Sequence, residues 1–461
     1  MFSDKTYSLR RNALKEKIKS GIILFLGNDE SPINYSGNTY PFRQDSSFLY
    51  YFGLDEPGLV GVIDVDEDKE ILFGDDVSLE DTVWTGPMPK LAAKRTLIGV
   101  ENSQPKRNLH DYIKRAILLK KKIHFLPQYR AENIIRLSSL IGHPNSLVNK
   151  NVSVDLIKAV VSQREIKSKE EVAEIEFAIN ISQQMYKIAM KKIKPGLYER
   201  EIVGLLEGIA RSYGSGISFP MIFSVHGEIL HNHYYGNKMK DGDMVVVDSG
   251  AESLMHYASD ITRTIPVGGK FTKKQKDIYN IVLLAHNEAV ANIKAGIKYK
   301  YVHLLAAKVI AKGLKELGLM KGNIDEAVEV GAHALFFPHG LGHMLGLDVH
   351  DMEGLGEDYV GYNNLIHRGK QFGLAYLRLA KELQSGFVLT VEPGIYFIPE
   401  LINIWKAEKK FTNFINYNVI EKYLDFGGIR LENDVLVEND GCRILGKKIP
   451  LTVKEVEDAR K

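Results

Sequence analysis

The sequence predicts an α/β protein of two domains, and three observations support this fold class. The chain has 461 residues, more than one hydrophobic core usually serves. Short apolar runs alternate with helical patterns over residues 21–161. Beyond them, the order helix, helix, strands occurs twice, punctuated by IKPG at residues 193–196 and IKAG at residues 293–296. We therefore expect one domain over residues 1–160 and a second over residues 161–461.

The N-terminal domain opens with an amphipathic helix that ends before Gly21. Three short runs rich in β-branched and aromatic residues then indicate strands: GIILFLGN, GLVGVIDV and KEILFGD. Apolar residues at helical spacing indicate two helices, HDYIKRAILLKK and AENIIRLSSLIG. Strands and helices in this alternation predict an α/β domain.

The second domain begins with a charged stretch, SQREIKSKEEVAEIE. Ser168 is placed to cap a helix there, with Glu171 in the capping-box position. The two helix pairs that follow suggest an internal repeat, in which two αβ halves face each other. Coincidence is the alternative, because Lys-x-Gly is an ordinary way for a helix to end.

The segment MVVVDSGAESLMHYASDITRTIP, residues 244–266, predicts a β-hairpin. Asp248 and Asp260 then lie on neighbouring strands. Two unpaired carboxylates at that separation repel each other, and a metal ion would compensate their charge. The alternative is that Asp248 ends a strand and Asp260 caps a turn, which are common positions for aspartate.

The C-terminal third favours the metal, because it holds three further potential ligands. These are His343 in FPHGLGHMLGLDVHD, Glu392 in FVLTVEPGIYF and Glu432 in GGIRLENDVLV. Four carboxylates and one imidazole suit two adjacent ions of Mn²⁺, Co²⁺ or Zn²⁺ better than a thiolate site would. The one cysteine, Cys442, can form neither a zinc finger nor a disulfide within the chain.

Composition excludes several other classes of protein. The hydrophobic fraction of 44% and the charged fraction of 26% are those of a soluble globular protein. With 60 basic and 58 acidic residues, the net charge of +2 gives no reason to expect nucleic acid or an anionic membrane as a partner. No apolar run approaches the ~20 residues of a membrane span, and no secretory signal is recognisable. We therefore expect a cytoplasmic protein.

Four segments resemble, in order, the five-ligand signature of the pita-bread metallopeptidases: DSG…SDITRT, HGLGHMLGLDVHD, TVEPGIY and GGIRLENDVLV. The resemblance is to the branch of Xaa-Pro aminopeptidases (aminopeptidase P) and Xaa-Pro dipeptidases (prolidases). YPFRQDSSFLYYFGLDEPG is similar to a segment of the creatinase-type N-terminal domain in that branch. The resemblance implies a creatinase-like α/β domain, followed by a pita-bread domain with pseudo-twofold αβ halves and the metal site between them.

The resemblance also implies a role for each ligand. Asp248 would chelate one ion, while His343 and Glu392 would complete the other. Asp260 and Glu432 would bridge the two ions, most simply Mn²⁺, with Co²⁺ or Zn²⁺ as alternatives. A hydroxide between the ions would then attack the peptide carbonyl. Asp248 and Asp260 are 12 positions apart, one more than the family leads us to expect, and a longer hairpin tip or a bulge would absorb this.

Three histidines match further active-site positions of the family: His231, His339 and His350. We expect them to hydrogen bond to the substrate carbonyl and to the tetrahedral oxyanion. His233 would point the same way as His231 if this stretch is extended, but the family offset favours His231. Arg430 shares a strand face with Glu432 and is expected to support the ligands, with a surface ion pair as the alternative. The remaining candidates match nothing and are expected to be structural: His226, His256, His286, His303, His333 and His367.

Three functions remain open at this point. The first is an Xaa-Pro aminopeptidase, which removes an N-terminal residue when proline is second. The second is a prolidase limited to Xaa-Pro dipeptides. The third is a non-catalytic pita-bread binding protein, which the complete ligand set disfavours. The resemblance further implies peptide substrates with proline in the second position and a homodimer or homotetramer.

Two long connections flank Glu392. From Asp351 to Glu392 is 41 residues and from Glu392 to Glu432 is 40, whereas simple hairpin loops take about 2–5. We call residues 356–386 the first insert and residues 399–428 the second insert. The first insert has apolar residues at helix-like spacing, and the second has aromatic residues that need an apolar partner: Trp405, Phe411, Phe414 and Tyr417. We expect the inserts to pack together at the rim of the site. The alternative is a surface embellishment without effect on catalysis.

Overall fold

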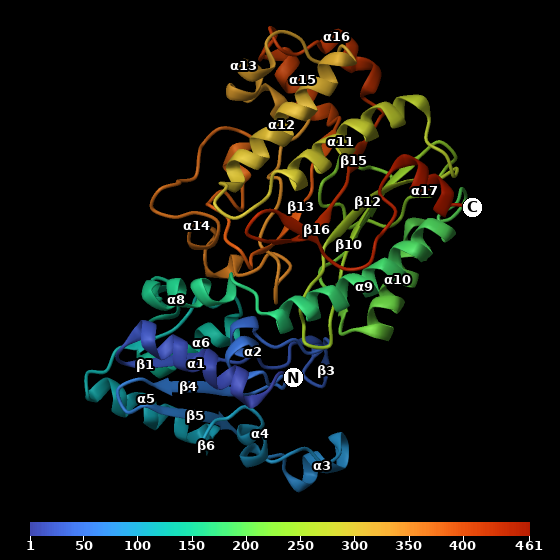
Figure 1. Cartoon of the computed structure of the whole chain (residues 1–461). Helices are drawn as coiled ribbons and strands as arrows, with labels where there is room; N and C mark the ends of the chain where they lie inside the picture. The colour runs from blue at the N-terminus through green and yellow to red at the C-terminus, as the bar shows by residue number, and fades with distance from the viewer. The chain divides into compact units, whose positions relative to one another are not determined.

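The computed structural model describes residues 1–461, which divide into two compact units (Figure 1). The first unit comprises Met1–Arg164 with the short segment Gly354–Tyr359. The second unit comprises Glu165–Glu353 and Val360–Lys461. The return of Gly354–Tyr359 to the first unit had no counterpart in the predicted domain limits. None of the helices combines the length and the apolar character that a membrane span requires.

The first unit is built on a five-stranded sheet with the order β6-β5-β4-β1-β7. Its strands are β1 (Ile22–Leu26), β4 (Val60–Asp64), β5 (Lys69–Gly74), β6 (Asn102–Pro105) and β7 (Ile123–His124). β1 pairs antiparallel with β4 and parallel with β7. The three strands expected from GIILFLGN, GLVGVIDV and KEILFGD are therefore confirmed as β1, β4 and β5. Both expected helices are confirmed as α5 (Leu109–Leu118) and α6 (Ala131–Ile141). β2 (Pro32–Tyr35) and β3 (Asn38–Thr39) form a separate hairpin.

The helices of the first unit are α1 (Asp4–Ile18), α2 (Ser46–Phe52), α3 (Leu79–Thr85), α4 (Leu91–Leu97), α5 (Leu109–Leu118), α6 (Ala131–Ile141), α7 (Asn145–Val148) and α8 (Val154–Arg164). One core gathers the apolar residues of the strands and of α5 and α6, including Leu24, Val62, Ile113 and Leu137. The apolar runs of the strands and the apolar faces of the helices thus pack into one shared core.

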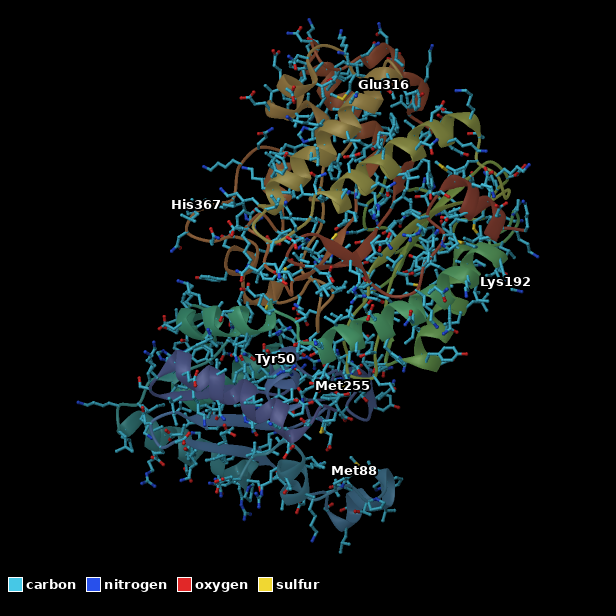
Figure 2. The ribbon with its side chains drawn as sticks, viewed as in Figure 1. Tyr50, Met88, Lys192, Met255, Glu316 and His367 are labelled. Atoms are coloured by element: carbon cyan, nitrogen blue, oxygen red, sulfur yellow. The ribbon has the colours of Figure 1, made fainter.

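The second unit consists of two halves, and each half begins with two long helices that are followed by strands. The first half contains α9 (Lys169–Lys192), α10 (Glu199–Tyr213), β8 (Gly216–Ile217), β9 (Ile222–Ser224), β10 (Met244–Ser249), β11 (Ala251–Glu252) and β12 (Ile261–Pro266). The second half contains α11 (Lys273–Ala291), α12 (Tyr299–Glu316), α13 (Ile324–Glu329), β13 (Val388–Val391), β14 (Gly394–Tyr396), α15 (Pro399–Ala407), α16 (Tyr417–Ile420), β15 (Gly428–Arg430), β16 (Asn433–Val437), β17 (Cys442–Ile444) and α17 (Val453–Ala459). The short α14 (Glu357–Val360) lies mostly in the segment Gly354–Tyr359 of the first unit. Side chains fill the space between these helices and strands (Figure 2).

Backbone contacts confirm the internal repeat. Gly196 N–H donates to Met239 O after α9, and Gly296 N–H donates to Leu383 O after α11. Isolated bridges then join Tyr198 to Lys238 and Lys298 to Glu382 in the same relation. Gly196 and Gly296 also share a positive φ, of 94° and 84°. IKPG and IKAG therefore mark equivalent turns of two similar halves.

The predicted start of α9 is also confirmed. The Ser168 side chain accepts a hydrogen bond from Glu171 N–H at 3.2 Å, and Glu171 Oε2 accepts one from Ser168 N–H at 2.9 Å. This reciprocal capping satisfies two backbone donors that a helix start leaves without partners.

The expected hairpin is present as β10 and β12, which pair antiparallel with Asp248 opposite Thr262. Asp260 stands immediately before β12. Gly250, directly after β10, is required because a Cβ there would lie 1.7 Å from Ser259 O. The connection between Asp248 and Asp260, one residue longer than expected, contains β11, which pairs with β8, and a bridge from Glu252 to Ala258.

The two halves meet where β12 passes the connection between β15 and β16. Glu432 N–H donates to Thr262 O at 3.0 Å, and Thr264 Oγ1 donates to Arg430 O at 3.1 Å. The buried Arg263 guanidinium reinforces this seam by donating to Glu432 O at 2.6 Å. Residues from both halves are therefore held side by side at the centre of the unit.

The first insert is not helical, which corrects the expectation from its apolar spacing. Beyond the short α14 it forms only the 3₁₀ turn Leu374–Tyr376. Gly373 has φ of 86°, a left-handed conformation that an α-helix cannot continue through. Its apolar residues instead form a small core of their own: Tyr362, Leu377 and Ala380 with Ile366 and Leu374.

The two inserts do contact each other, as expected. The ring of Phe372 in the first insert lies 5.7 Å from the ring of Trp405 on α15, and Trp405 lies 5.4 Å from Phe411. The second insert also pairs with the segment that follows α12, because Lys321 N–H donates to Phe414 O. Trp405 and Phe411 of the second insert thus have the apolar partners that they need.

Candidate metal centre

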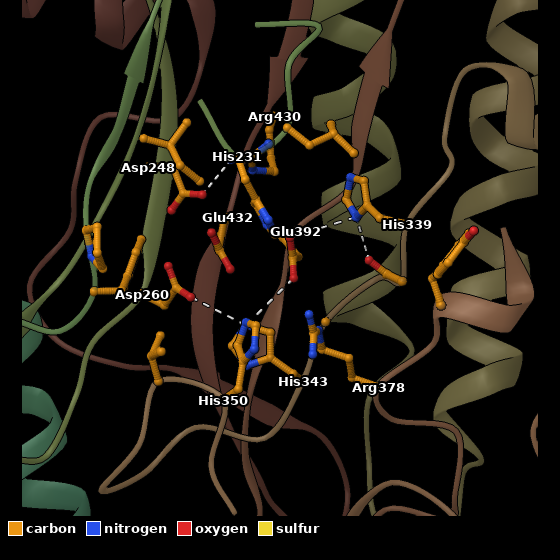
Figure 3. Close-up of a pocket in the computed structure, with 18 of the residues that line it drawn as sticks. His231, Asp248, Asp260, His339, His343, His350, Arg378, Glu392, Arg430 and Glu432 are labelled. Carbon is orange, nitrogen blue, oxygen red and sulfur yellow. Dashed lines mark hydrogen bonds and ion pairs between the residues drawn. The ribbon is translucent and has the colours of Figure 1, made fainter. Parts of the chain in front are cut away.

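The five predicted ligands come from both halves and line one cavity of about 390 Å³ (Figure 3). Asp248 stands near the end of β10 and Asp260 directly before β12. Glu392 follows β13, Glu432 lies between β15 and β16, and His343 lies in the irregular segment after the 3₁₀ turn Ala332–Leu335. Sequence positions up to 184 residues apart are thus brought to one place.

The side chains of Asp260, His343 and Glu432 are the tightest group. One ligand atom from each of the three lies within 4.8 Å of the other two. His343 Nε2 is 3.4 Å from Asp260 Oδ2 and 3.8 Å from Glu392 Oε1. These atoms are close enough to bind one cation together. They cannot all find hydrogen-bond partners among themselves, because most of them are acceptors.

Several carboxylate oxygens of the cavity have no hydrogen-bond donor. Asp248 Oδ1, Asp260 Oδ1 and Glu432 Oε1 are all buried without a partner. An unpaired buried anion is costly unless a cation compensates it. The set of oxygens and one imidazole fits Mn²⁺, Co²⁺ or Zn²⁺. The residues present therefore fit the divalent ions that the resemblance implies.

The electrostatics of the three carboxyls point the same way. Burial, and then the neighbouring Glu432, raise the pKa of Asp260 well above its usual range. Burial raises the pKa of Glu392 to about 8, and burial together with Glu392 raises that of Glu432. Without a cation, these groups resist carrying their charges together.

His343 presents its Nε2 atom to the carboxylates. Its Nδ1 lies 3.0 Å from Met344 O and donates to this carbonyl, which fixes the proton on Nδ1. Burial lowers the pKa of the ring well below its usual value, so the imidazole is neutral. The lone pair of Nε2 is then free to bind a metal ion.

Arg430 is a buried residue of the site and not a surface ion pair. Its Nη2 lies 2.5 Å from Asp248 Oδ2, its Nη1 donates to Tyr396 Oη at 3.0 Å, and its Nε donates to Thr262 Oγ1 at 3.2 Å. Thr262 Oγ1 in turn donates to Glu432 Oε2 at 2.7 Å. One guanidinium thus fixes two of the carboxylates, Asp248 directly and Glu432 through Thr262.

The direction of the hydrogen bonds around His339 follows from Arg430. Arg430 can only donate, so Tyr396 Oη accepts from it and donates its own proton to His339 Nε2, 2.8 Å away. His339 Nδ1 then donates to Gly340 O at 2.7 Å. Burial, followed by Arg430, lowers the pKa of His339 to about 3. Both ring nitrogens have protein partners, and the substrate contact expected of His339 stays a prediction.

His350 packs directly on the ligand His343. The two ring centroids are 4.1 Å apart, and His350 Nδ1 lies 2.6 Å from Glu353 Oε2. Glu353 also pairs with Arg378, which lines the cavity. His350 is therefore held between a ligand and a charged pair, and its role in catalysis stays a prediction.

His231 and His233 both line the cavity, but they do not lie on a strand. His231 is in a turn. The segment is therefore not a strand in which His231 and His233 would point the same way. The loop is fastened by the buried Glu199, which accepts hydrogen bonds from Val225 N–H at 2.9 Å and Asn237 N–H at 3.2 Å. Burial, followed by Arg430, lowers the pKa of His231. The choice of His231 over His233 stays a prediction.

Four further residues of the site were missed in the sequence: Thr262, Tyr376, Arg378 and Tyr396. Thr262 and Tyr396 stand next to predicted ligands in SDITRT and TVEPGIY, so their motifs offered a signal. Tyr376 and Arg378 lie in the first insert, which offered none, since only the folded chain brings it to the cavity.

Two family models match the chain. The model described as metallopeptidase family M24 matches residues 173–439. The model described as the aminopeptidase P N-terminal domain matches residues 7–124. The first match spans more than half of the chain and contains every predicted ligand.

Similar curated proteins carry two different names. The Xaa-Pro dipeptidase of Homo sapiens is 32% identical over 474 residues, covering 98% of this chain and 92% of the relative. A probable Xaa-Pro aminopeptidase of Sordaria macrospora is 32% identical over 438 residues, covering 92% and 88%. The degree of identity is the same for both names, so it does not choose between them.

Solved structures of bacterial enzymes share the fold over the whole chain. Aminopeptidase PepP of Pseudomonas aeruginosa matches with a TM-score of 0.80 and 27% identity, covering 100% of this chain and 98% of the other. Zinc-substituted aminopeptidase P of Escherichia coli, in complex with product, matches with a TM-score of 0.81 and 28% identity over the same shares. The predicted architecture is confirmed by these matches.

Proposed function

The chain belongs to metallopeptidase family M24, and we propose that it is an Xaa-Pro aminopeptidase, which removes an N-terminal residue when proline is second. One observation carries the proposal. The cavity gathers Asp248, Asp260, His343, Glu392 and Glu432, and three of their carboxylate oxygens are buried without any donor. A non-catalytic binding protein would have no use for such unpaired charges.

The same five residues would hold two divalent ions, for which we propose Mn²⁺, with Co²⁺ or Zn²⁺ as alternatives. When bound, the ions supply Lewis acidity to a peptide carbonyl and lower the pKa of a water molecule. Arg430 and Thr262 keep Asp248 and Glu432 oriented for this task. His343 contributes a neutral Nε2 atom because its proton is fixed on Nδ1.

The charges of the cavity orient a peptide. The N-terminal ammonium of a substrate is attracted to the carboxylates, of which Asp248 stands beside the apolar Ile222 of β9. Figure 3 shows Arg378 on the other side of Glu392 and Glu432 from Asp248 and Asp260. The part of the peptide beyond the cleaved bond therefore lies toward Arg378. His231 lines the cavity, and its proposed role is to donate a hydrogen bond to the developing oxyanion.

A prolidase limited to Xaa-Pro dipeptides is the second candidate, and Arg378 is the observation that favours it. Its guanidinium lines the cavity and has a fork of donors suited to a free carboxylate. In a dipeptide the proline carboxylate follows the cleaved bond directly, so it would reach the Arg378 end. A longer peptide presents an amide at that place instead.

A substrate panel separates the two candidates. The metal-stripped protein is reconstituted with Mn²⁺, Co²⁺ or Zn²⁺ and assayed with Ala-Pro, Ala-Pro-Ala, Ala-Pro-Ala-Ala and the control Ala-Ala-Ala. We expect the tripeptide and tetrapeptide to be cleaved at least as efficiently as the dipeptide, and the control not at all. Cleavage of Ala-Pro alone would establish the dipeptidase. Failure with every Xaa-Pro peptide and every metal would refute both.

A further inference from the structure

Tyr376 lines the cavity and is not one of the five predicted metal ligands. It ends the 3₁₀ turn Leu374–Tyr376 in the first insert and lines the cavity together with Arg378. Leu377, between them, is 2% exposed and belongs to the small core of the insert. Leu377 O also accepts a hydrogen bond from Tyr362 Oη at 2.7 Å. The buried Leu377 thus fixes its two neighbours on the cavity side.

The ring of Tyr376 is braced from behind while its own surface is open. It is 58% exposed, yet it meets Phe372 edge to face at 5.9 Å and 90°, and Phe372 packs on the buried Trp405 at 5.7 Å. The backbone is held too. A Cβ added to Gly340 would lie 3.4 Å from Tyr376 O. Such a held, open aromatic ring is available to a ligand at little cost in conformational entropy.

The two ends of the cavity differ in charge, which places Tyr376 on the carboxyl side of the substrate. Figure 3 shows Arg378 opposite the end that holds Asp248 and Asp260, and Tyr376 lines the same cavity two residues before Arg378 in the chain. A peptide bound with its ammonium toward the carboxylates puts the residue after the cleaved bond at the Arg378 end. In an Xaa-Pro substrate this residue is proline, whose rigid apolar ring suits an aromatic face.

We propose that Tyr376 is the aromatic wall that packs on the proline ring of the substrate and so contributes to the specificity for proline. This inference rests on the proposed function. It assigns to the first insert a part in substrate binding, and to Phe372 and Trp405 the task of positioning the Tyr376 ring. Because the contact exists both before and during reaction, it strengthens binding uniformly and acts on KM more than on kcat.

The test compares three variants with Ala-Pro and Ala-Pro-Ala as substrates. Tyr376→Ala should raise KM roughly 5- to 10-fold for both peptides, the range given by one aromatic contact, with kcat within about 2-fold of the parent. Tyr376→Phe keeps the ring and should behave as the parent. Tyr301→Ala is the matched control, because Tyr301 on α12 is also 58% exposed and does not line the cavity.

An unchanged KM for Tyr376→Ala would overturn the proposal, and so would a rise seen only with Ala-Pro-Ala, which would place the ring on the third residue. A direct binding measurement keeps this result apart from the proposed function. Calorimetry with Pro-Leu, a product-like dipeptide, should give a Kd about 5- to 10-fold weaker for Tyr376→Ala. If the parent cleaves no Xaa-Pro peptide but this loss is observed, the proposed function fails and the Tyr376 contact stands. Equal Kd values would refute the contact whatever the activity.

Discussion

Arg430 Nη2 and Asp248 Oδ2 form a buried ion pair at 2.5 Å between the two halves of the second unit. Arg430 stands on β15 and Asp248 on β10, so the pair joins strands from the two halves. It satisfies one oxygen of Asp248 and leaves the other, Oδ1, buried without a donor. The pair therefore orients a predicted ligand without consuming it.

Arg430→Met should destabilise the protein strongly, because it leaves Asp248 buried without its partner. Removing one member of a buried pair costs about 3–5 kcal/mol in the free energy of unfolding. Arg443→Met is the matched control, since Arg443 pairs with Glu176 at the surface, and it should cost less than about 1 kcal/mol. Urea unfolding of the metal-free proteins measures both. Equal small losses would show that the pair does not hold Asp248.

Thr262→Val should weaken metal binding while leaving the strand intact. Thr262 Oγ1 donates to Glu432 Oε2. Loss of a hydrogen bond that orients a metal ligand typically costs about 10- to 100-fold in metal affinity. Thr264→Val is the control on the same strand, because Thr264 Oγ1 donates to the backbone of Arg430 instead. Competitive titration with a chelator gives both affinities. A loss of equal size in the two variants would mean that only strand packing is affected.

Glu199→Gln should reduce activity without loss of metal. Glu199 fastens both ends of the loop that carries His231 and His233, and an amide nitrogen cannot accept the hydrogen bonds that a carboxylate oxygen accepts. We expect kcat/KM to fall by roughly 10-fold, as donors to the oxyanion lose their position. Glu201→Gln, which alters only the cap of α10, is the control. Metal content measured beside the kinetics shows whether the effect runs through the loop.

His333 should make the protein sensitive to mild acid. Burial lowers its pKa from 6.5 to about 4, so between these values the unfolded chain binds a proton that the folded chain does not. Its contribution to stability is complete above pH 6.5 and is lost as the pH falls toward 4, by up to about 3 kcal/mol. His333→Leu should flatten this part of the stability profile. His367→Leu, at an exposed position, should leave the profile unchanged.

The fold could be predicted to a large extent because its patterns are local. The β10–β12 hairpin follows from two β-rich runs around Gly250, and α9 from the capping box of Ser168 and Glu171. The pairing of the two halves could be inferred from the repeated IKPG and IKAG turns, since each glycine has a positive φ in the turn that follows a long helix. Periodicity and capping act within a few residues, so the sequence displays them directly.

The first insert shows where such reasoning ends. Its leucines have helical spacing, but Gly373 and the apolar contacts of Tyr362 and Leu377 give an irregular fold around a small core. Arg430 was expected to support the ligands, with a surface ion pair as the alternative, and only its buried contacts with Asp248 and Tyr396 decide between the two. Tertiary contacts between distant segments decide both cases, and no local pattern records them.

The most direct test of the account is the number of metal ions that the protein binds. Metal-stripped protein and the variants Asp260→Asn and Glu432→Gln are dialysed against Mn²⁺, and the bound metal is measured per chain. We expect two ions in the parent protein and no more than one in either variant, because both carboxylates are assigned to bridge the ions, with most of kcat lost and the fold retained. A parent protein that binds no divalent ion, or variants that keep both ions, would contradict the assignment of the site.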